Sequence, residues 1–204
     1  MLNTEVFKNI KASQKQILIV TKYWDSEKTS DILKEWENNY SDIFYGLWEN
    51  RIEQIQEKNI AREKIHFIGN IQSKKIPDIV KSCSTIHSLS SLKHAAIIER
   101  QWLDIVCFVQ IQLDTEKENG ISGDELWSFI ETCKDNKYLK IIWISGMWSN
   151  DISDKWKREE FQKLIKLRDT HLPEWLISAG ISIDYEIALE EWIDIVRVGQ
   201  KSII

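Results

Sequence analysis

Short apolar runs rich in β-branched residues alternate along the chain with longer amphipathic segments. Several runs are nearly continuous in Ile, Val and Leu, which is typical of parallel strands covered on both faces. The runs predict strands over residues 16–22, 42–46, 64–69, 85–89, 104–113, 139–146, 174–180 and 194–199. Apolar positions at helical spacing predict helices between them, over residues 26–38, 47–59, 74–82, 92–99, 123–134, 155–171 and 184–191.

Eight strands that alternate with helices at a spacing of about 25 residues predict an α/β fold, the (β/α)8 TIM barrel. A doubly wound open sheet is the alternative, but it usually carries a glycine-rich first turn, and no G-x-G-x-x-G occurs. Only residues 200–204 follow the eighth predicted strand, so we expect no outer helix after it. An apolar stripe within residues 2–13 predicts an additional N-terminal helix that fills this gap. Because no linker or shift in composition interrupts the chain, we expect residues 1–204 to form a single domain.

Composition narrows the class of function. The net charge of −5 and the pI near 5.5 argue against nucleic acid or an anionic membrane as the main partner. No apolar run in the sequence approaches the roughly 18 residues that a membrane-spanning helix needs. The first residues lack the apolar stretch and the cleavage site of a secretory signal, and we therefore expect a cytoplasmic protein.

The cysteines and histidines predict neither a metal site nor a nucleophilic triad. The three cysteines, Cys83, Cys107 and Cys133, are widely spaced and form no C-x-x-C pair, which is typical of small buried residues in a reducing compartment. His66 and His87 lie within predicted strands and have no third ligand nearby in the sequence. We therefore expect both histidines to be core residues.

One candidate for chemistry is the lysine that ends the first predicted strand. Functional side chains of a (β/α)8 barrel cluster where the strands end, at the C-terminal mouth. At the mouth of an apolar barrel the ammonium of Lys22 would be partly desolvated, and its amine could then act as a nucleophile. The alternative is a lysine that simply emerges from the strand into water.

Groups that suit a phosphate follow the seventh and eighth predicted strands. Arg197 and Gly199 offer a guanidinium fork and open backbone N–H groups, and Ser182 adds a hydroxyl before a predicted helix. Loops at these two positions often bind phosphate in barrels. A lysine amine and a phosphate cup at one mouth are what pyridoxal 5′-phosphate (PLP) requires, because its aldehyde condenses with an amine and its phosphate anchors it.

Plainer interpretations of the same residues remain open. Ser182 and Asp184 precede a predicted helix and could serve as its caps. Arg197 could equally form an ion pair with Glu190 or Glu191.

Five motifs occur in a fixed order along nearly the whole chain: IVTK ending at Lys22, HFIGNIQSKK at 66–75, IHSLSSL at 86–92, the segment 110–120, and SIDYE followed by VRVG at 182–199. In this order they resemble the motifs of the YggS/PROSC-type pyridoxal phosphate homeostasis proteins, which are relatives of the alanine racemase barrel. The resemblance implies a fold type III PLP-binding barrel in which Lys22 carries the cofactor as a Schiff base. It also implies that the cofactor pocket is lined by Lys22, Asn50, Ser182, Arg197, Gly199 and Gln200.

The chain departs from these family motifs at several positions. The segment 45–50 carries two extra residues relative to the family's FGEN, and Gln200 replaces a small hydroxyl residue that touches the phosphate. Trp148 stands near a family methionine, and Trp192 replaces a glycine before the last strand. Together with Trp48, these tryptophans are expected to place large rings close to the pocket.

The resemblance implies a monomeric protein of vitamin B6 homeostasis that binds PLP, with PLP-dependent apoenzymes as possible recipients. We expect no substrate turnover, because alanine racemase-type enzymes need a second, β-rich domain and the barrel leaves no residues to build one. A PLP-dependent amino-acid racemase or lyase is the alternative. A further alternative is a drifted barrel that no longer binds PLP.

Overall fold

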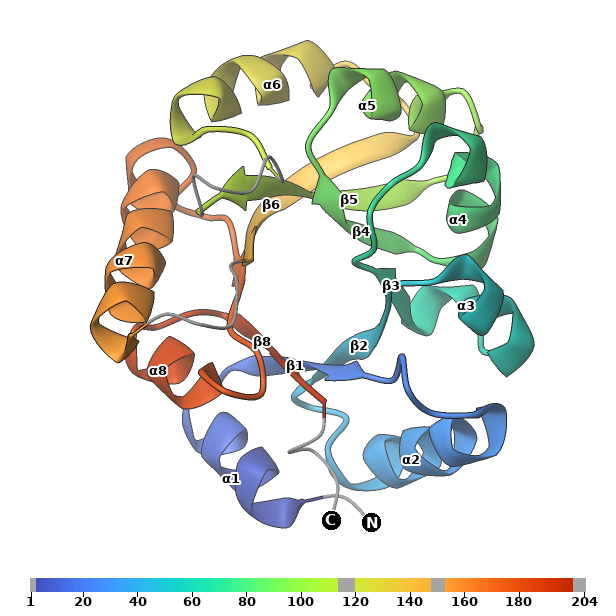
Figure 1. The fold of residues 1–204 in the computed structure, drawn as a ribbon, viewed down its shortest axis with the longest axis vertical. Coiled ribbons are helices and arrows are strands. Elements are labelled where there is room, and N and C mark those ends of the chain that lie inside the picture. The colour runs from blue at the N-terminus through green and yellow to red at the C-terminus, as the bar shows by residue number, and fades with distance from the viewer. Residues whose placement is uncertain (1–2, 114–119, 148–152, 200–204) are drawn as a thin grey trace.

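The computed structural model describes residues 3–113, 120–147 and 153–199. Within them, eight parallel strands close into a barrel in which each strand pairs with the next and β8 pairs with β1 (Figure 1). The strands are β1 (Gln16–Val20), β2 (Phe44–Glu49), β3 (Ile65–Phe67), β4 (Thr85–Leu89), β5 (Ile105–Gln112), β6 (Leu139–Met147), β7 (Ile177–Ser178) and β8 (Ile195–Val198). The predicted (β/α)8 barrel is therefore confirmed, and the open sheet is excluded.

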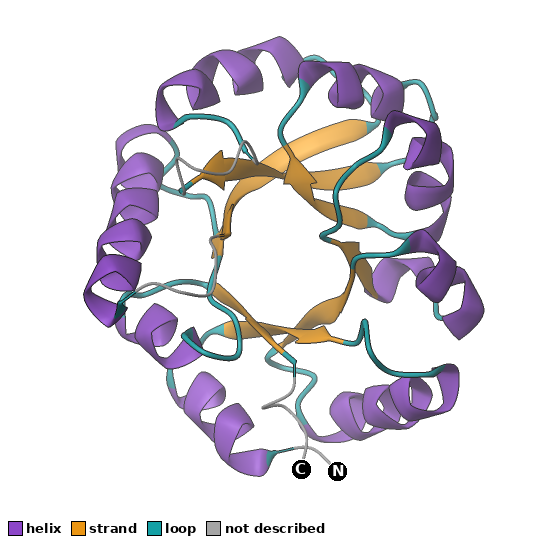
Figure 2. Ribbon diagram, viewed as in Figure 1, coloured by secondary structure: helices purple, strands orange, loops and turns teal. Residues whose placement is uncertain are grey.

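Helices form a ring around the outside of the barrel (Figure 2). They are α1 (Thr4–Ala12), α2 (Ser26–Asn39), α3 (Ile52–Lys58), α4 (Ile76–Ser82), α5 (Leu92–Glu99), α6 (Leu126–Cys133), α7 (Asp154–His171) and α8 (Tyr185–Glu190). Short 3-10 helices η1 (Arg62–Lys64), η2 (Ser73–Lys75) and η3 (Gly123–Glu125) lie in the connections. None of the helices in the described ranges is long and apolar enough to cross a membrane.

The helix α1 lies against the barrel between α8 and α2 (Figure 1). Its apolar face, formed by Val6, Phe7 and Ile10, is buried. The ring of Phe7 meets Trp36 of α2 edge-on at a centroid distance of 4.8 Å. Each buried side chain of this size stabilises the docked helix by about 1.5–3 kcal/mol. The predicted N-terminal helix is thus confirmed, and it stands beside α8 where the ring of outer helices closes.

The second strand is longer than the sequence pattern predicts. A strand over 42–46 and a helix from Leu47 were expected, whereas β2 continues to Glu49 and α3 begins only at Ile52. Leu47 and Trp48 are buried and pair with β1, so the apolar pattern there is that of a strand. This correction moves Trp48 and Glu49 to the C-terminal end of a strand, at the barrel mouth.

Gly46 lies within β2 and does not end it. A Cβ atom at this position would lie 2.3 Å from Cδ2 of His66, so the glycine allows the imidazole of β3 to pack against the strand backbone. The register between β1 and β2 also shifts by one residue between Ile17 and Leu18, which is the signature of a β-bulge. A glycine inside a strand therefore gives the same sequence signal as a glycine that ends one.

The interior of the barrel contains a buried pair of histidines. Nδ1 of His66 lies 2.9 Å from Nε2 of His87, and the His87 ring stacks on Phe108 at 3.7 Å. Burial lowers the pKa of His66 to about 3 and lowers the pKa of His87 well below its usual value. Both imidazoles are therefore neutral core groups, as the sequence predicts.

The three cysteines are free thiols in the protein core, as predicted. Burial raises the pKa of Cys83 to about 12 and the pKa of Cys107 well above its usual value. These thiols therefore behave as small apolar residues that fill space between the barrel and its helices.

Candidate functional site

Lys22 lies in a turn directly after β1, at the C-terminal mouth of the barrel. The carbonyl oxygen of Thr21 accepts a hydrogen bond of 2.9 Å from the N–H of Trp24, so Lys22 and Tyr23 are the central residues of a β-turn. The half-buried Lys22 places its Nζ atom 4.9 Å from the Tyr23 ring centroid and 5.5 Å from that of Trp48. The amine therefore lies against aromatic surface.

Trp48 connects this lysine with Arg197. Its indole is only 8% exposed, and its ring centroid lies 5.7 Å from Cζ of Arg197. Cation–π contacts of this kind contribute about 0.5–2 kcal/mol each, depending on how far the cation is desolvated. One aromatic ring thus contacts both cationic side chains that the sequence analysis selected, and Trp48 is close to the candidate site as predicted.

Arg197 points into the barrel from β8 and is only 2% exposed. Its Nη2 donates to the carbonyl oxygen of Gly146 at 2.6 Å, and its Nε donates to that of Gly180 at 3.3 Å. Burial lowers the pKa of Arg197 to about 10, and the nearby carboxylate of Asp184 acts in the opposite direction. The guanidinium is therefore a fixed positive charge below the mouth.

The alternative pairing of Arg197 with Glu190 or Glu191 is wrong. Both carboxylates bind the guanidinium of Arg158, which reaches them from α7, and the contact to Glu191 measures 2.8 Å. These three side chains lie on the outside of the barrel wall, whereas Arg197 lies inside it.

Ser182 and Gly199 meet where the loops after β7 and β8 begin. The N–H of Gly199 donates to Oγ of Ser182 at 2.8 Å, which leaves the hydroxyl proton of Ser182 available for a further acceptor. Oδ1 of Asp184 accepts a 2.5 Å hydrogen bond from the N–H of Ile181, and Asp184 does not cap α8 with its side chain. Asp184 therefore occupies the N-cap position of α8, but its side chain makes no capping hydrogen bond there.

Asn50 follows β2 directly and is half-buried at the same end of the barrel. The backbone of Gly69 approaches it closely, because a Cβ atom there would lie 2.4 Å from the carbonyl oxygen of Asn50. No hydrogen bond joins Asn50 to Lys22 within the described residues. Gln200 and Trp148 lie outside the described residues.

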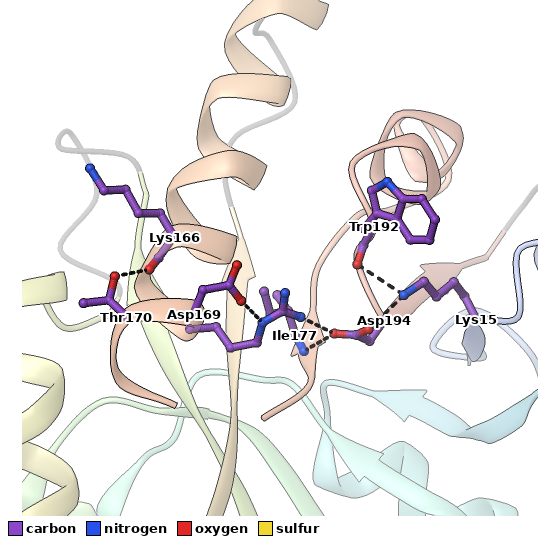
Figure 3. Close-up of polar contacts among 8 residues, drawn as sticks. Lys15, Lys166, Asp169, Thr170, Ile177, Trp192 and Asp194 are labelled. Atoms are coloured by element: carbon purple, nitrogen blue, oxygen red, sulfur yellow. Dashed lines mark hydrogen bonds and ion pairs between the residues drawn. The ribbon is translucent and has the colours of Figure 1, made fainter. Parts of the chain in front are cut away.

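Trp192 lies at the opposite end of the barrel, contrary to the prediction. It precedes β8, its side chain is 72% exposed, and Nζ of Lys15 lies 5.7 Å from its ring (Figure 3). Its φ of +65° is left-handed, a conformation that favours glycine. The backbone therefore accounts for the glycine of the family motif at this position, and the ring does not narrow the mouth.

A buried ion pair beside Lys22 was not predicted. Lys58, the last residue of α3, donates through Nζ to Oε1 of Glu49 and to the carbonyl oxygen of Thr21, the latter at 2.6 Å. The hydroxyl of Thr21 donates to the same Glu49 oxygen. No motif marks this pair, and the helix predicted from Leu47 concealed that Glu49 ends a strand.

A cavity of about 120 Å³ opens at the C-terminal ends of β3 to β6. Its walls include the backbone of Gly69 and the side chains of Ser88, Gln110 and Met147. The hydroxyl of Ser88 donates to the carbonyl oxygen of Gly69 at 2.7 Å, which joins two of the loops around the cavity. The mouth therefore has a small cavity on the side of β3 to β6.

Comparison with known proteins places the chain among named relatives, although no family model matches it. It is 30% identical over 165 residues to the Pyridoxal phosphate homeostasis protein of Helicobacter pylori, which covers 74% of this chain and 73% of that protein. It is 33% identical over 150 residues to the protein of the same name from Schizosaccharomyces pombe. That match covers 67% of this chain and 62% of the relative, so the chain spans less than two thirds of the yeast protein.

Solved structures share the fold. PipY of Synechococcus elongatus, determined with PLP bound, superposes with a TM-score of 0.77 at 17% identity, covering 98% of this chain and all of that one. Alanine racemase of Clostridium difficile superposes with a TM-score of 0.74 at 15% identity, covering 95% of this chain and 57% of the enzyme.

The closed eight-stranded barrel belongs to the class of (β/α)8 fold that PipY and alanine racemase share. Within this class, the chain belongs to the pyridoxal phosphate homeostasis protein family. The family resemblance drawn from the order of the sequence motifs is thereby confirmed.

Proposed function

We propose that this protein binds PLP at the barrel mouth and takes part in PLP homeostasis, with the amine of Lys22 holding the aldehyde of the cofactor. The observation that carries the proposal is the contact of one indole, that of Trp48, with both Lys22 and Arg197 at a single mouth. The names of the curated relatives and the PLP-bound structure of PipY support the same ligand.

The residues in the loops after β7 and β8 fit the phosphate group of PLP. The hydroxyl of Ser182 is oriented by the N–H of Gly199 and retains a proton that it can donate to an anion. The buried charge of Arg197 favours a negatively charged ligand nearby. The backbone N–H of Gln200 would extend this cup, and Asn50 would line the pocket from the side of β2.

The chain's own residues would bind and orient the cofactor. When bound, PLP supplies an electrophilic aldehyde and an electron-withdrawing ring. Lys22 provides the amine, and the turn that holds it aims that amine across the mouth. The indole of Trp48 covers apolar area and keeps water away from the space between Lys22 and Arg197.

We further propose that the barrel carries or buffers PLP without turning over a substrate, as one monomeric domain that supplies PLP-dependent apoenzymes. Within the described residues, the amine of Lys22 contacts aromatic rings and forms no ion pair with a carboxylate. Proton abstraction from a substrate needs a positioned acid–base group within hydrogen-bond reach. Among the described residues, the aromatic contacts of Lys22 support a role in holding a cofactor.

An amino-acid racemase or lyase is the second candidate, because alanine racemase shares the barrel fold and a cavity of about 120 Å³ opens at the C-terminal ends of β3 to β6. Incubation of the PLP-loaded protein with amino acids, followed by chiral analysis, separates the two functions. Turnover that disappears in Lys22→Ala would favour the enzyme.

Titration of the protein with PLP, followed by visible absorbance, tests the binding proposal. We expect an absorbance band that Lys22→Ala abolishes and that Lys28→Ala, a change at an exposed lysine over the Trp24 ring, leaves intact. Arg197→Ala should weaken retention of PLP by about 1.5–3 kcal/mol, the usual contribution of a hydrogen bond to a charged group. A colourless protein at saturating PLP would refute the proposal and favour a drifted barrel.

A further inference from the structure

We propose that Lys58 and Glu49 are positioning residues for Lys22. Their buried ion pair clamps the turn from which the amine of Lys22 is presented to the barrel mouth. The proposal rests on the proposed function, because it concerns how Lys22 is held for its reaction with PLP. It adds two residues, on β2 and α3, that touch neither the phosphate cup nor the cation–π contacts of the mouth.

The clamp acts on Thr21, the residue directly before Lys22. The carbonyl oxygen of Thr21 accepts from Nζ of Lys58 at 2.6 Å and from the N–H of Trp24 at 2.9 Å. The second of these bonds closes the β-turn that contains Lys22. Lys58 therefore holds the same oxygen on which the turn closes.

The other polar groups of Thr21 are also engaged. Its hydroxyl donates to Oε1 of Glu49, and its N–H donates to the carbonyl oxygen of Trp48 at 3.2 Å. Glu49 is itself held by β3, because the N–H of Ile68 donates to its carbonyl oxygen at 2.8 Å. With every polar group of Thr21 bonded and its side chain buried, the backbone position of Lys22 is set by the clamp.

The energetics of the pair favour a role in positioning over one in stability. The Lys58 and Glu49 side chains are only 4% and 2% exposed, so both charges are removed from water. Oε2 of Glu49 has no hydrogen-bond partner within the described residues, which adds to the desolvation cost. Apolar residues of similar volume often stabilise such a site as well as a buried ion pair does. What apolar residues cannot supply is a donor for the carbonyl oxygen of Thr21.

The step that depends on this placement is the condensation of the Lys22 amine with the aldehyde of PLP. A C–N bond forms, the C–O bond of the aldehyde breaks, and its oxygen leaves as water with the two protons of the neutral amine. Because a misplacement of about 1 Å can slow a reaction by about 100-fold, loosening the turn should slow condensation by about 10- to 100-fold. Phosphate binding depends on Ser182 and Gly199, in the loops after β7 and β8, rather than on the clamp, and should be spared.

The test compares the unmodified protein with Lys58→Met, with the double variant Lys58→Met/Glu49→Leu, and with Lys64→Met. The double variant removes both buried charges and so preserves folding if the single variant does not fold. Lys64→Met is the matched control, because it breaks an ion pair with Glu37 that lies on the surface, away from Lys22. Folding of each variant is verified by circular dichroism and thermal unfolding.

Three readouts are measured. The first is the rate of covalent attachment of PLP to Lys22, trapped with borohydride at timed intervals. The second is the affinity for pyridoxine 5′-phosphate, which has the phosphate but no aldehyde. The third is hydrogen exchange of the peptide that contains Lys22 and Trp24, measured without any ligand.

We expect both Lys58 variants to attach PLP about 10- to 100-fold more slowly and to exchange the Trp24 amide faster, with affinity for pyridoxine 5′-phosphate within about twofold of the unmodified protein. Attachment rates equal to that of Lys64→Met would overturn the positioning role, and so would an equal loss of pyridoxine 5′-phosphate affinity. If the unmodified protein attaches no PLP to Lys22, the proposed function itself fails and the positioning role fails with it.

Discussion

The buried histidine pair predicts a loss of stability in mild acid. The pKa of His66 is about 3 in the folded protein because the ring is buried, whereas an unfolded chain has a histidine pKa of about 6.5. The folded pKa is the lower of the two, so the stability tied to this group is fully present above about pH 6.5. It is lost as the pH falls toward the folded value, because only the unfolded chain takes up the proton.

The size of the loss follows from these values. Between about pH 7 and pH 5, a group with unfolded and folded pKa values of about 6.5 and 3 lowers the free energy of unfolding by about 2 kcal/mol. Burial also lowers the pKa of His87 well below its usual value, so the contribution of His87 has the same sign. A loss of about 2 kcal/mol or more is a large share of the 5–15 kcal/mol typical of a folded domain.

Urea unfolding at several pH values measures this effect. The double variant His66→Asn/His87→Asn removes both titrating rings, so its free energy of unfolding should change by at least about 2 kcal/mol less over the same pH range. The two proteins are compared by how steeply the free energy of unfolding changes with pH, so a lower overall stability of the variant does not affect the result. Equal slopes for the two proteins would refute the reasoning, as would an NMR titration in which His66 of the folded protein gains a proton near pH 6.5.

Three further changes test the packing of the barrel. Gly46→Ala should lower the free energy of unfolding by about 1–3 kcal/mol or more, because the new Cβ would lie 2.3 Å from Cδ2 of His66. Urea unfolding measures this loss, and unchanged stability would contradict the close approach of the two residues. The carboxylate of Asp194 accepts hydrogen bonds from Arg168 at 3.1 Å and from the backbone N–H of Ile177 in β7 (Figure 3). Asp194→Asn should therefore lower the melting temperature by an amount equivalent to about 1–3 kcal/mol. A melting temperature like that of the unmodified protein would show that these bonds do not stabilise the fold. Trp192→Gly should leave the stability in thermal unfolding unchanged or raise it by up to about 1 kcal/mol, because glycine adopts a φ of +65° without strain. A clear loss of stability would mean that the indole ring contributes to packing.

The sequence predicts the barrel well because its signal is periodic and repeated. Eight apolar runs with amphipathic segments between them leave few other ways to bury both faces of a parallel sheet. The pattern fails at β2, where Gly46 looks like a strand end and Leu47 like a helix start. The residues around Gly46 carry no information about His66, which lies twenty residues further along the chain. In the fold, the imidazole of His66 needs the space next to that glycine.

The candidate site is predictable only in part, because its groups meet through the closure of the barrel. The pairing of Ser182 with Gly199 joins two loops, and the sequence indicates each residue but not the contact. The clamp of Lys58 and Glu49 on Thr21 joins three elements and follows no motif. Family motifs supply the order of the site residues, and only the folded chain shows which of them contact one another.

Peptide mapping after borohydride reduction of the PLP-treated protein tests the central claim most directly. Lys22 follows Thr21 in the chain, and Lys58 donates a hydrogen bond to the carbonyl oxygen of Thr21. We assign the reactive amine to Lys22 alone, because Lys58 is buried and forms an ion pair with Glu49. We predict a phosphopyridoxyl group on the peptide that contains Lys22 and none on the peptide that contains Lys58. Modification of Lys58 or of surface lysines, with Lys22 unmodified, would contradict the account.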